Sequence, residues 1–215
     1  MLLYYITDRT QFPGNEGQRR KAVIAKIEEA ARSGVDFIQL REKDLPTREL
    51  EDLAQQAGRA VRENAPRKPG TQEAATRLLI NSRSDVAIAC DLDGVHLRSD
   101  DISPRDARSI WAHAGRPGRP LIAVSCHSEQ DVARAVSEQA DLAVIAPIFE
   151  KEGVSSIGLD VLRSACRQAI PVIALGGITL ENAADCVAAG AAGVAAIRLF
   201  QQNEIAKVVQ QLRTC

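Results

Sequence analysis

Eight short apolar runs, separated by amphipathic stretches, recur along the whole chain. Each run has about four to six residues, the length of a buried parallel strand, and the stretches between them carry apolar residues at helical spacing. The runs are Leu2–Ile6, 36–41, Arg77–Asn81, Gly94–Leu97, 120–125, 142–147, 171–175 and 193–197. Strands that alternate with helices in this way predict an α/β fold with a parallel sheet.

Eight strand–helix units fit a (β/α)8 barrel, and barrels of about 200–250 residues form one domain. Four strands are entered through a similar junction, and such a weak repeat is typical of stacked βα units. The junctions are at 33–38, 91–96, 139–144 and 191–196. An open doubly wound sheet is the alternative, but it carries a glycine-rich loop after its first strand, where this chain reads Thr7-Asp8-Arg9. We therefore expect a TIM barrel that spans residues 1–215 as a single domain.

Composition narrows the function classes. The chain is 45% hydrophobic but only 3% aromatic, so the core must consist mainly of Ala, Val, Ile and Leu. A net charge of −1, from 27 basic and 28 acidic residues, provides no basic stripe for nucleic acid. No segment approaches the roughly 18 apolar residues of a membrane span. The five cysteines lack metal-binding spacing, which favours reduced thiols and a cytoplasmic protein.

The carboxyl ends of barrel strands, with the loops that follow them, form the active-site face of such folds. At the end of the second strand, alternation directs Gln39, Arg41 and Lys43 to the same side. Two cations in a low-dielectric barrel mouth are costly unless an anion compensates them. That anion could be a ligand, or it could be an internal partner such as Glu42 or Asp8.

Two glycines, Gly176 and Gly177, follow the seventh strand. Glycine permits close backbone approach, and free N–H groups at this place can hold a phosphate with help from the loop after the eighth strand. A tight turn would explain the two glycines as well. Ile197 and Arg198 end the eighth strand, and the cation of Arg198 favours phosphate binding.

Two histidines and a pair of aspartates lie at or near strand ends. His127 follows the fifth strand, just after Ser125, which is a further candidate substrate contact. His127 could act as a general acid or base near neutral pH, or it could be merely hydrogen-bonded. His96 lies within an apolar strand, so we expect it inside the barrel. Asp101, with Asp100, could bind a metal if another carboxylate lies nearby, or could belong to the cap region of the next helix.

Several short strings occur in a fixed order along the chain. They are Tyr-Ile-Thr-Asp-Arg at 5–9, Gln-Leu-Arg-Glu-Lys at 39–43, Leu-Ile-Asn at 79–81, Asp-Gly-Val-His-Leu at 93–97, Val-Ser-Cys-His-Ser at 124–128, Pro-Ile-Phe at 147–149 and Val-Ile-Ala-Leu-Gly-Gly-Ile at 172–178. Together they resemble the thiamine-phosphate synthase/TenI family over nearly the whole chain. The ordered set, with the string at 39–43, is highly specific.

The resemblance implies one of two activities. A synthase joins a hydroxymethylpyrimidine diphosphate to a thiazole phosphate and releases pyrophosphate with the help of magnesium. A TenI-type member instead catalyses the aromatising tautomerisation of a thiazole phosphate carboxylate, a proton transfer that needs no metal.

The resemblance also implies roles for individual residues. In a synthase, the pyrimidine and its pyrophosphate are contacted by residues of the second and third strands: Gln39, Arg41, Lys43 and Asn81. The thiazole phosphate is held by the last two strand ends, at Gly177, Ile197 and Arg198. Asp101 corresponds to a magnesium ligand of synthases. His127 lies where TenI-type members place an acid–base histidine.

Three places depart from the family pattern. Ser82 stands where the pattern has an aspartate that binds magnesium, and losing one of two carboxylates weakens divalent binding. Glu-Lys-Glu-Gly-Val at 150–154 replaces a Pro-Thr-x-Thr-Lys loop that grips pyrophosphate, although Lys151 could substitute in part. Arg198 replaces a serine and could clamp a phosphate bidentately.

These departures favour a TenI-like thiazole tautomerase without a metal, in which His127 moves the proton. The first alternative is a divergent synthase that rebuilds a magnesium site from Asp100, Asp101 and Glu152. The second is a catalytically inactive barrel that binds a phosphorylated ligand. The expected partner is a small phosphorylated thiazole, joined in a synthase by a pyrimidine diphosphate. The sequence does not decide between a monomer and a homo-oligomer, because one apolar helix face could pack inward or across a dimer. Its residues are Leu180, Ile205, 208–209 and Leu212.

Overall fold

The eight apolar runs form parallel strands that pair in chain order, and β1 pairs with β8 to close a barrel. The computed structural model describes residues 1–68, 70–71, 74–116, 118–150, 153 and 155–214. Within these residues the strands are β1 (Leu2–Ile6), β2 (Phe37–Leu40), β3 (Arg77–Asn81), β4 (Gly94–Leu97), β5 (Leu121–Cys126), β6 (Leu142–Ile145), β7 (Val172–Leu175) and β8 (Gly193–Ala196). The predicted (β/α)8 TIM barrel is confirmed.

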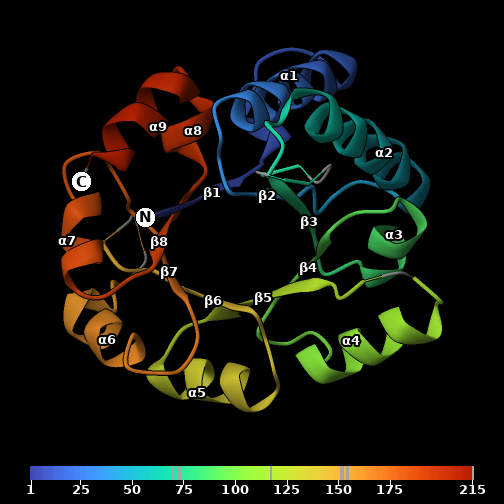
Figure 1. Ribbon diagram of the computed structural model, residues 1–215. Coiled ribbons are helices and arrows are strands. Elements are labelled where there is room, and N and C mark those ends of the chain that lie inside the picture. The colour runs from blue at the N-terminus through green and yellow to red at the C-terminus, as the bar shows by residue number, and fades with distance from the viewer. Residues whose placement is uncertain (69, 72–73, 117, 151–152, 154, 215) are drawn as a thin grey trace.

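Helices surround the barrel, so that in Figure 1 the strands form an inner ring and the helices an outer one. In the described part of the chain they are the 3-10 helix η1 (Arg9–Gln11) and the α-helices α1 (Glu16–Arg32), α2 (Thr47–Asn64), α3 (Ser84–Ala89), α4 (Pro104–His113), α5 (Glu129–Ser137), α6 (Gly158–Ala165), α7 (Ala183–Ala188), α8 (Arg198–Gln201) and α9 (Ile205–Arg213). Among these helices, none is long and apolar enough to cross a membrane.

Several strand ends differ from the predicted ones by one or two residues. β2 begins after Asp36, whose carboxylate accepts the backbone N–H of Leu3 at the entrance to the barrel. β6 ends at Ile145 and β7 begins at Val172, whereas the predicted strands include a proline at each of these ends. Proline has no N–H to donate to a ladder, so it stops the pairing.

The repeated junction ties the amino-terminal ends of the strands together. Asp36, Asp93 and Asp141 occupy the same place in three copies, and each carboxylate accepts a backbone N–H of the preceding strand at 2.7–2.8 Å. An arginine pairs with each of them: Arg213, Arg77 and Arg108. The fourth copy has no aspartate and uses the backbone N–H of Ala192, which donates to Val172. This end of the barrel is thereby fixed, opposite the predicted site.

Apolar side chains fill two layers. A small cluster lies inside the barrel: Tyr4, Ile6, Leu79, Ala123, Leu142, Val144, Ile173 and Ala195. The larger layer lies between the strands and the surrounding helices and is rich in Ala, Val, Ile and Leu, as the composition predicts.

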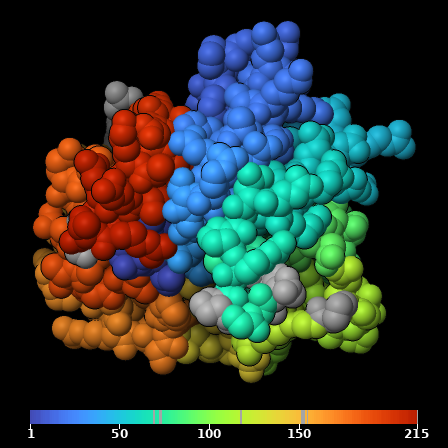
Figure 2. All heavy atoms as spheres, turned by 45° about the horizontal axis from the view of Figure 1, so that its top comes forward, coloured from blue at the N-terminus to red at the C-terminus, as the bar shows by residue number. Residues whose placement is uncertain are grey.

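The last helix closes the outer ring against the first. Figure 2 shows the red C-terminal helices directly beside the blue α1, and Lys26 of α1 donates to the backbone carbonyl of Asn203. On α9, Ile205, Val208 and Leu212 are buried in the larger apolar layer. Of the two arrangements considered for this helix face, inward packing and packing across a dimer, the structure has the first.

Candidate functional site

Four polar side chains lie in the upper layer of the barrel interior. They come from neighbouring strands, and alternation along each strand directs them inward: Gln39, Asn81, His96 and Ser125. Gln39 and His96 are buried, whereas Asn81 and Ser125 are half-buried. The layer forms a polar floor beneath the mouth of the barrel.

His96 has a hydrogen-bonding partner at each ring nitrogen. The Tyr4 hydroxyl lies 2.9 Å from Nδ1, and the Ser125 hydroxyl lies 3.0 Å from Nε2. Burial, with a smaller contribution from Arg41, lowers the pKa of His96 to about 3. The predicted interior position is confirmed. Because the ring is neutral near pH 7 and both nitrogens are engaged, His96 orders the polar floor.

Gln39 carries a polar atom that lacks a partner. Its Nε2 donates to Asn81 Oδ1 at 2.9 Å, and Asn81 Nδ2 donates to the Ser82 hydroxyl at 2.9 Å. Gln39 Oε1 is buried and accepts no hydrogen bond from the described residues. A buried acceptor without a donor costs about 1–3 kcal/mol, which a ligand with an N–H group would recover.

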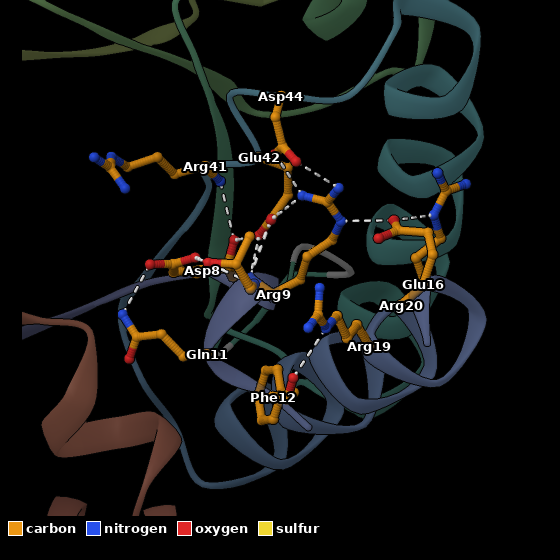
Figure 3. Close-up of polar contacts among 12 residues, drawn as sticks. Asp8, Arg9, Gln11, Phe12, Glu16, Arg19, Arg20, Arg41, Glu42 and Asp44 are labelled. Atoms are coloured by element: carbon orange, nitrogen blue, oxygen red, sulfur yellow. Dashed lines mark hydrogen bonds and ion pairs between the residues drawn. The ribbon is translucent and has the colours of Figure 1, made fainter. Parts of the chain in front are cut away.

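A buried ion network holds the segment that follows β2. Glu42, whose side chain is 1% exposed, accepts hydrogen bonds from the Thr7 hydroxyl at 2.5 Å and the Arg9 backbone N–H at 3.0 Å. The Arg9 guanidinium pairs with Glu42 at 3.2 Å, Asp44 at 2.6 Å and Glu16 at 2.7 Å (Figure 3). Burial raises the pKa of Glu42, and the hydrogen bonds from Thr7 and Arg9 oppose this rise.

Arg41 faces away from these acids, whereas Lys43 lies in the turn that follows and lines a hollow together with Glu42. In Figure 3 the Arg41 side chain extends away from the Arg9 network. The alternative of an internal ion pair with Glu42 is not formed, because Glu42 pairs with Arg9. Within the described residues, neither the Arg41 guanidinium nor the Lys43 ammonium has a hydrogen bond or ion pair. Nearby Arg41 in the first place, then burial and Arg98, lower the pKa of Lys43.

Asp101 is engaged by Arg98, which follows β4. Asp101 Oδ2 accepts the backbone N–H of Arg98 at 2.7 Å, and Oδ1 lies 3.4 Å from its Nε. Asp100 pairs with the same guanidinium at 3.0 Å. The residue that caps α4 is Ser103 rather than either aspartate. In the described ranges, no three His, Cys, Asp or Glu side chains gather into a metal site.

A hollow of about 360 Å³ lies between the ends of β7 and β8. It is lined by residues of both strand ends, which include Gly176, Gly177, Ile197 and Arg198. A Cβ would lie 2.7 Å from Pro147 at the first glycine and 2.8 Å from Phe149 at the second, and φ is positive at both. The glycines thus serve the predicted turn and let the segment after β6 pack against it. The short α8 begins at Arg198, and such an extra helix completes the phosphate sites of many barrels.

His127 lies at the mouth, exposed, directly after β5. Its Nδ1 lies 2.9 Å from the backbone carbonyl of Ala146. A carbonyl only accepts, so Nδ1 carries the proton, and Nε2 of the neutral ring keeps its lone pair. The ring is therefore oriented by a backbone contact.

Three residues that shape the site receive no role from the sequence patterns: Tyr4, Arg9 and Arg98. A signal for Arg9 was present, because Glu42 alternates with Arg41 and so needs a cation from another segment. Arg98 follows its strand directly, as Arg198 does, and could have been found by the same rule. The predicted contributions of Lys151 and Glu152 lie outside the described residues.

Comparisons with known proteins agree with the predicted family. A family model described as thiamine monophosphate synthase matches residues 3–200. The thiamine-phosphate synthase of Methanoculleus marisnigri is 36% identical, over 98% of this chain and 93% of that protein. The thiamine-phosphate synthase of Chloroflexus aurantiacus is 34% identical, over 98% of this chain and 90% of that protein. The structure of a thiamine phosphate pyrophosphorylase from Pyrococcus furiosus covers 99% of this chain and 94% of its own, at a TM-score of 0.80 and 28% identity. The chain therefore belongs to the thiamine monophosphate synthase family.

Proposed function

We propose that this chain is a thiamine-phosphate synthase, which joins a pyrimidine diphosphate to a thiazole phosphate. The observation that carries the proposal is the unpartnered Gln39 Oε1 on the strand that leads to Arg41 and Lys43, two cations with no ion pair to the described residues. An aminopyrimidine diphosphate offers an N–H donor and a negative tail, so it complements both features. The names of the relatives support the same assignment.

In this reaction the methylene carbon of the pyrimidine forms a bond to the thiazole ring nitrogen. The bond from that carbon to the diphosphate oxygen breaks, and pyrophosphate leaves with the electron pair. Negative charge grows on the leaving group, so Arg41 and Lys43 would stabilise it. Gln39 would accept a hydrogen bond from the pyrimidine amine, and Asn81 holds the Gln39 amide in place.

The thiazole phosphate would bind on the opposite side of the mouth, in the hollow between β7 and β8. Arg198 can pair with the phosphate there, and the glycine backbone lets the phosphate approach closely. The two substrates would then meet above the polar floor. Holding both reactants in one geometry supplies a large part of catalysis in bimolecular reactions.

Chromatographic measurement of thiamine phosphate, formed from both substrates, tests this proposal. We expect turnover by the wild-type protein. Gln39→Leu should raise the KM for the pyrimidine diphosphate about tenfold, since one hydrogen bond is lost and a buried acceptor disappears with it. The KM for the thiazole phosphate should stay unchanged, and so should both constants in the exposed control Gln130→Leu. Absence of product at saturating concentrations of both substrates would refute the assignment.

A thiazole tautomerase is a second candidate function, and the oriented ring of His127 favours it. Loss of tautomerase turnover in His127→Asn, with unchanged binding of the thiazole phosphate carboxylate, would support this role. Unchanged turnover would exclude His127 as the proton carrier. Binding of either phosphorylated substrate without turnover in both assays would instead indicate an inactive binding barrel.

A further inference from the structure

The donor atoms at the end of β3 and β4 do not fit a magnesium ion. Magnesium prefers free carboxylate oxygens in octahedral geometry. Both oxygens of Asp101 already face Arg98, and Asp100 pairs with the same guanidinium. The Ser82 hydroxyl is neutral and accepts a hydrogen bond from Asn81. An ion placed here would have to displace a guanidinium from its carboxylates.

The buried carboxylate of Glu42 is not free to bind a metal ion either. Glu42 is fixed by the Thr7 hydroxyl and by the backbone and guanidinium of Arg9. Its side chain is 1% exposed and belongs to the network that faces away from Arg41. Glu42 therefore cannot turn towards the mouth without breaking the network that holds the segment after β2.

Positive charge gathers at this place instead. Lys43 and Arg98 line one hollow of about 280 Å³, together with Ser82 and with Glu42, whose charge is already paired with Arg9. Arg41, burial and Arg98 together lower the pKa of Lys43, and the negative charge of Asp8 opposes them only in part. Like charges this close repel one another. A polyanion bound between them would attract each cation and so offset this repulsion.

We infer that Arg41, Lys43 and Arg98 form a cation triad that binds the diphosphate group directly, in place of a divalent metal. The inference rests on the proposed function for the identity of the substrate. It goes further in assigning Arg98 to the diphosphate and in making this binding independent of magnesium. Arg98 can reach an anion without leaving its aspartates, because they engage its Nε and Nη2 and no described residue engages its Nη1.

Calorimetric titration of the full chain with inorganic pyrophosphate tests the triad. We expect binding in EDTA, and an increase in affinity of less than about threefold when magnesium is added. Arg98→Gln should weaken binding in EDTA about tenfold, because a charged guanidinium–phosphate contact is lost. Arg163→Gln, in an exposed pair on α6, should bind as the wild type does. Binding that requires magnesium, no binding at all, or binding insensitive to Arg98→Gln would overturn the inference.

A second pair of variants tests whether the carboxylate missing at position 82 explains the poor fit to magnesium. Neither variant removes a cation. Ser82 lies beside β4, since its backbone N–H donates to the His96 carbonyl, and it has φ 61°. Asp and Asn tolerate this left-handed backbone better than Ser does, so both substitutions should fold. Ser82→Asp should weaken pyrophosphate binding in EDTA and make it respond to magnesium. Ser82→Asn, of the same shape but uncharged, should stay insensitive to magnesium.

The outcomes separate this inference from the proposed function. Pyrophosphate binding in EDTA without formation of thiamine phosphate would sustain the triad and refute the synthase. Turnover together with strictly magnesium-dependent pyrophosphate binding would sustain the synthase and refute the triad. A Ser82→Asp variant that ignores magnesium would refute the claim that the missing carboxylate explains the misfit.

Discussion

On the β2–β4 side of the barrel mouth the charges belong to long side chains, whereas on the β7–β8 side the hollow is shaped by backbone. Arg41 and Lys43 are directed by the buried pair of Arg9 and Glu42 beneath them. Gly176 and Gly177 let the segment after β6 pack closely, because a Cβ at either glycine would clash with Pro147 or Phe149. The first side should therefore be sensitive to the loss of one charge, and the second to the gain of one carbon atom.

Removal of the Arg9 guanidinium should produce the largest effect. Arg9→Met keeps the apolar stem but leaves Glu42 buried without its cation. Breaking a buried ion pair from one side costs about 3–5 kcal/mol, and we expect a loss of this size in the free energy of unfolding. Urea denaturation followed by circular dichroism measures it.

The control for Arg9 is an exposed pair. Arg163→Met removes the partner of Asp160, whose side chain is 98% exposed, and should change stability by less than about 0.5 kcal/mol. The double variant Arg9→Met with Glu42→Gln should recover part of the loss, because no unpaired charge then remains buried. A loss below about 1 kcal/mol in Arg9→Met would contradict the claim that this network organises the β2 side.

The β7–β8 side should respond to added volume. Gly176→Ala meets both a positive φ of +98° and the Cα of Pro147 at 2.7 Å, so we expect a loss of about 2–3 kcal/mol in urea denaturation. Gly34→Ala separates the two causes, because Gly34 has φ +77° but no atom within 4 Å of its Cβ position. That control should lose only about 1 kcal/mol. Equal losses in the two variants would show that close packing at Gly176 has no energetic weight.

The fold could be predicted because its cause is repeated along the chain. Each buried strand needs a continuous apolar run, and each helix needs an apolar stripe, so eight copies of the pattern define eight units. The strand ends were less certain because they depend on contacts with other segments. Asp36, just before β2, accepts a backbone N–H of β1 with its carboxylate, a contact that no local pattern contains.

The site could be predicted only to the level of which residues face the mouth. Alternation places Gln39 and Arg41 on one side and Glu42 on the other. It does not say which cation Glu42 selects, because Arg9 lies 33 positions away in sequence. Strand alternation likewise does not predict the contact between Arg98 and Asp101. This contact gives Asp101 a guanidinium partner, which a motif comparison cannot detect.

The smallest expected effect is a pH dependence confined to the β2–β4 side. Arg41 and Arg98 help to lower the pKa of Lys43, and a bound anion favours its protonated form. Pyrophosphate affinity in EDTA should therefore fall as pH rises through this lowered pKa, and the fall should begin below the pKa of about 10.4 of an ordinary lysine.

Calorimetry at a series of pH values measures this dependence, with an expected loss of about tenfold or less. Pyrophosphate itself also titrates, so the slope needs a reference that carries a permanent charge. Lys43→Arg provides it, because a guanidinium stays protonated over the whole range. The difference between the two profiles belongs to Lys43 alone. Parallel profiles would mean that the Lys43 ammonium does not contact the anion, and would reduce the triad to its two arginines.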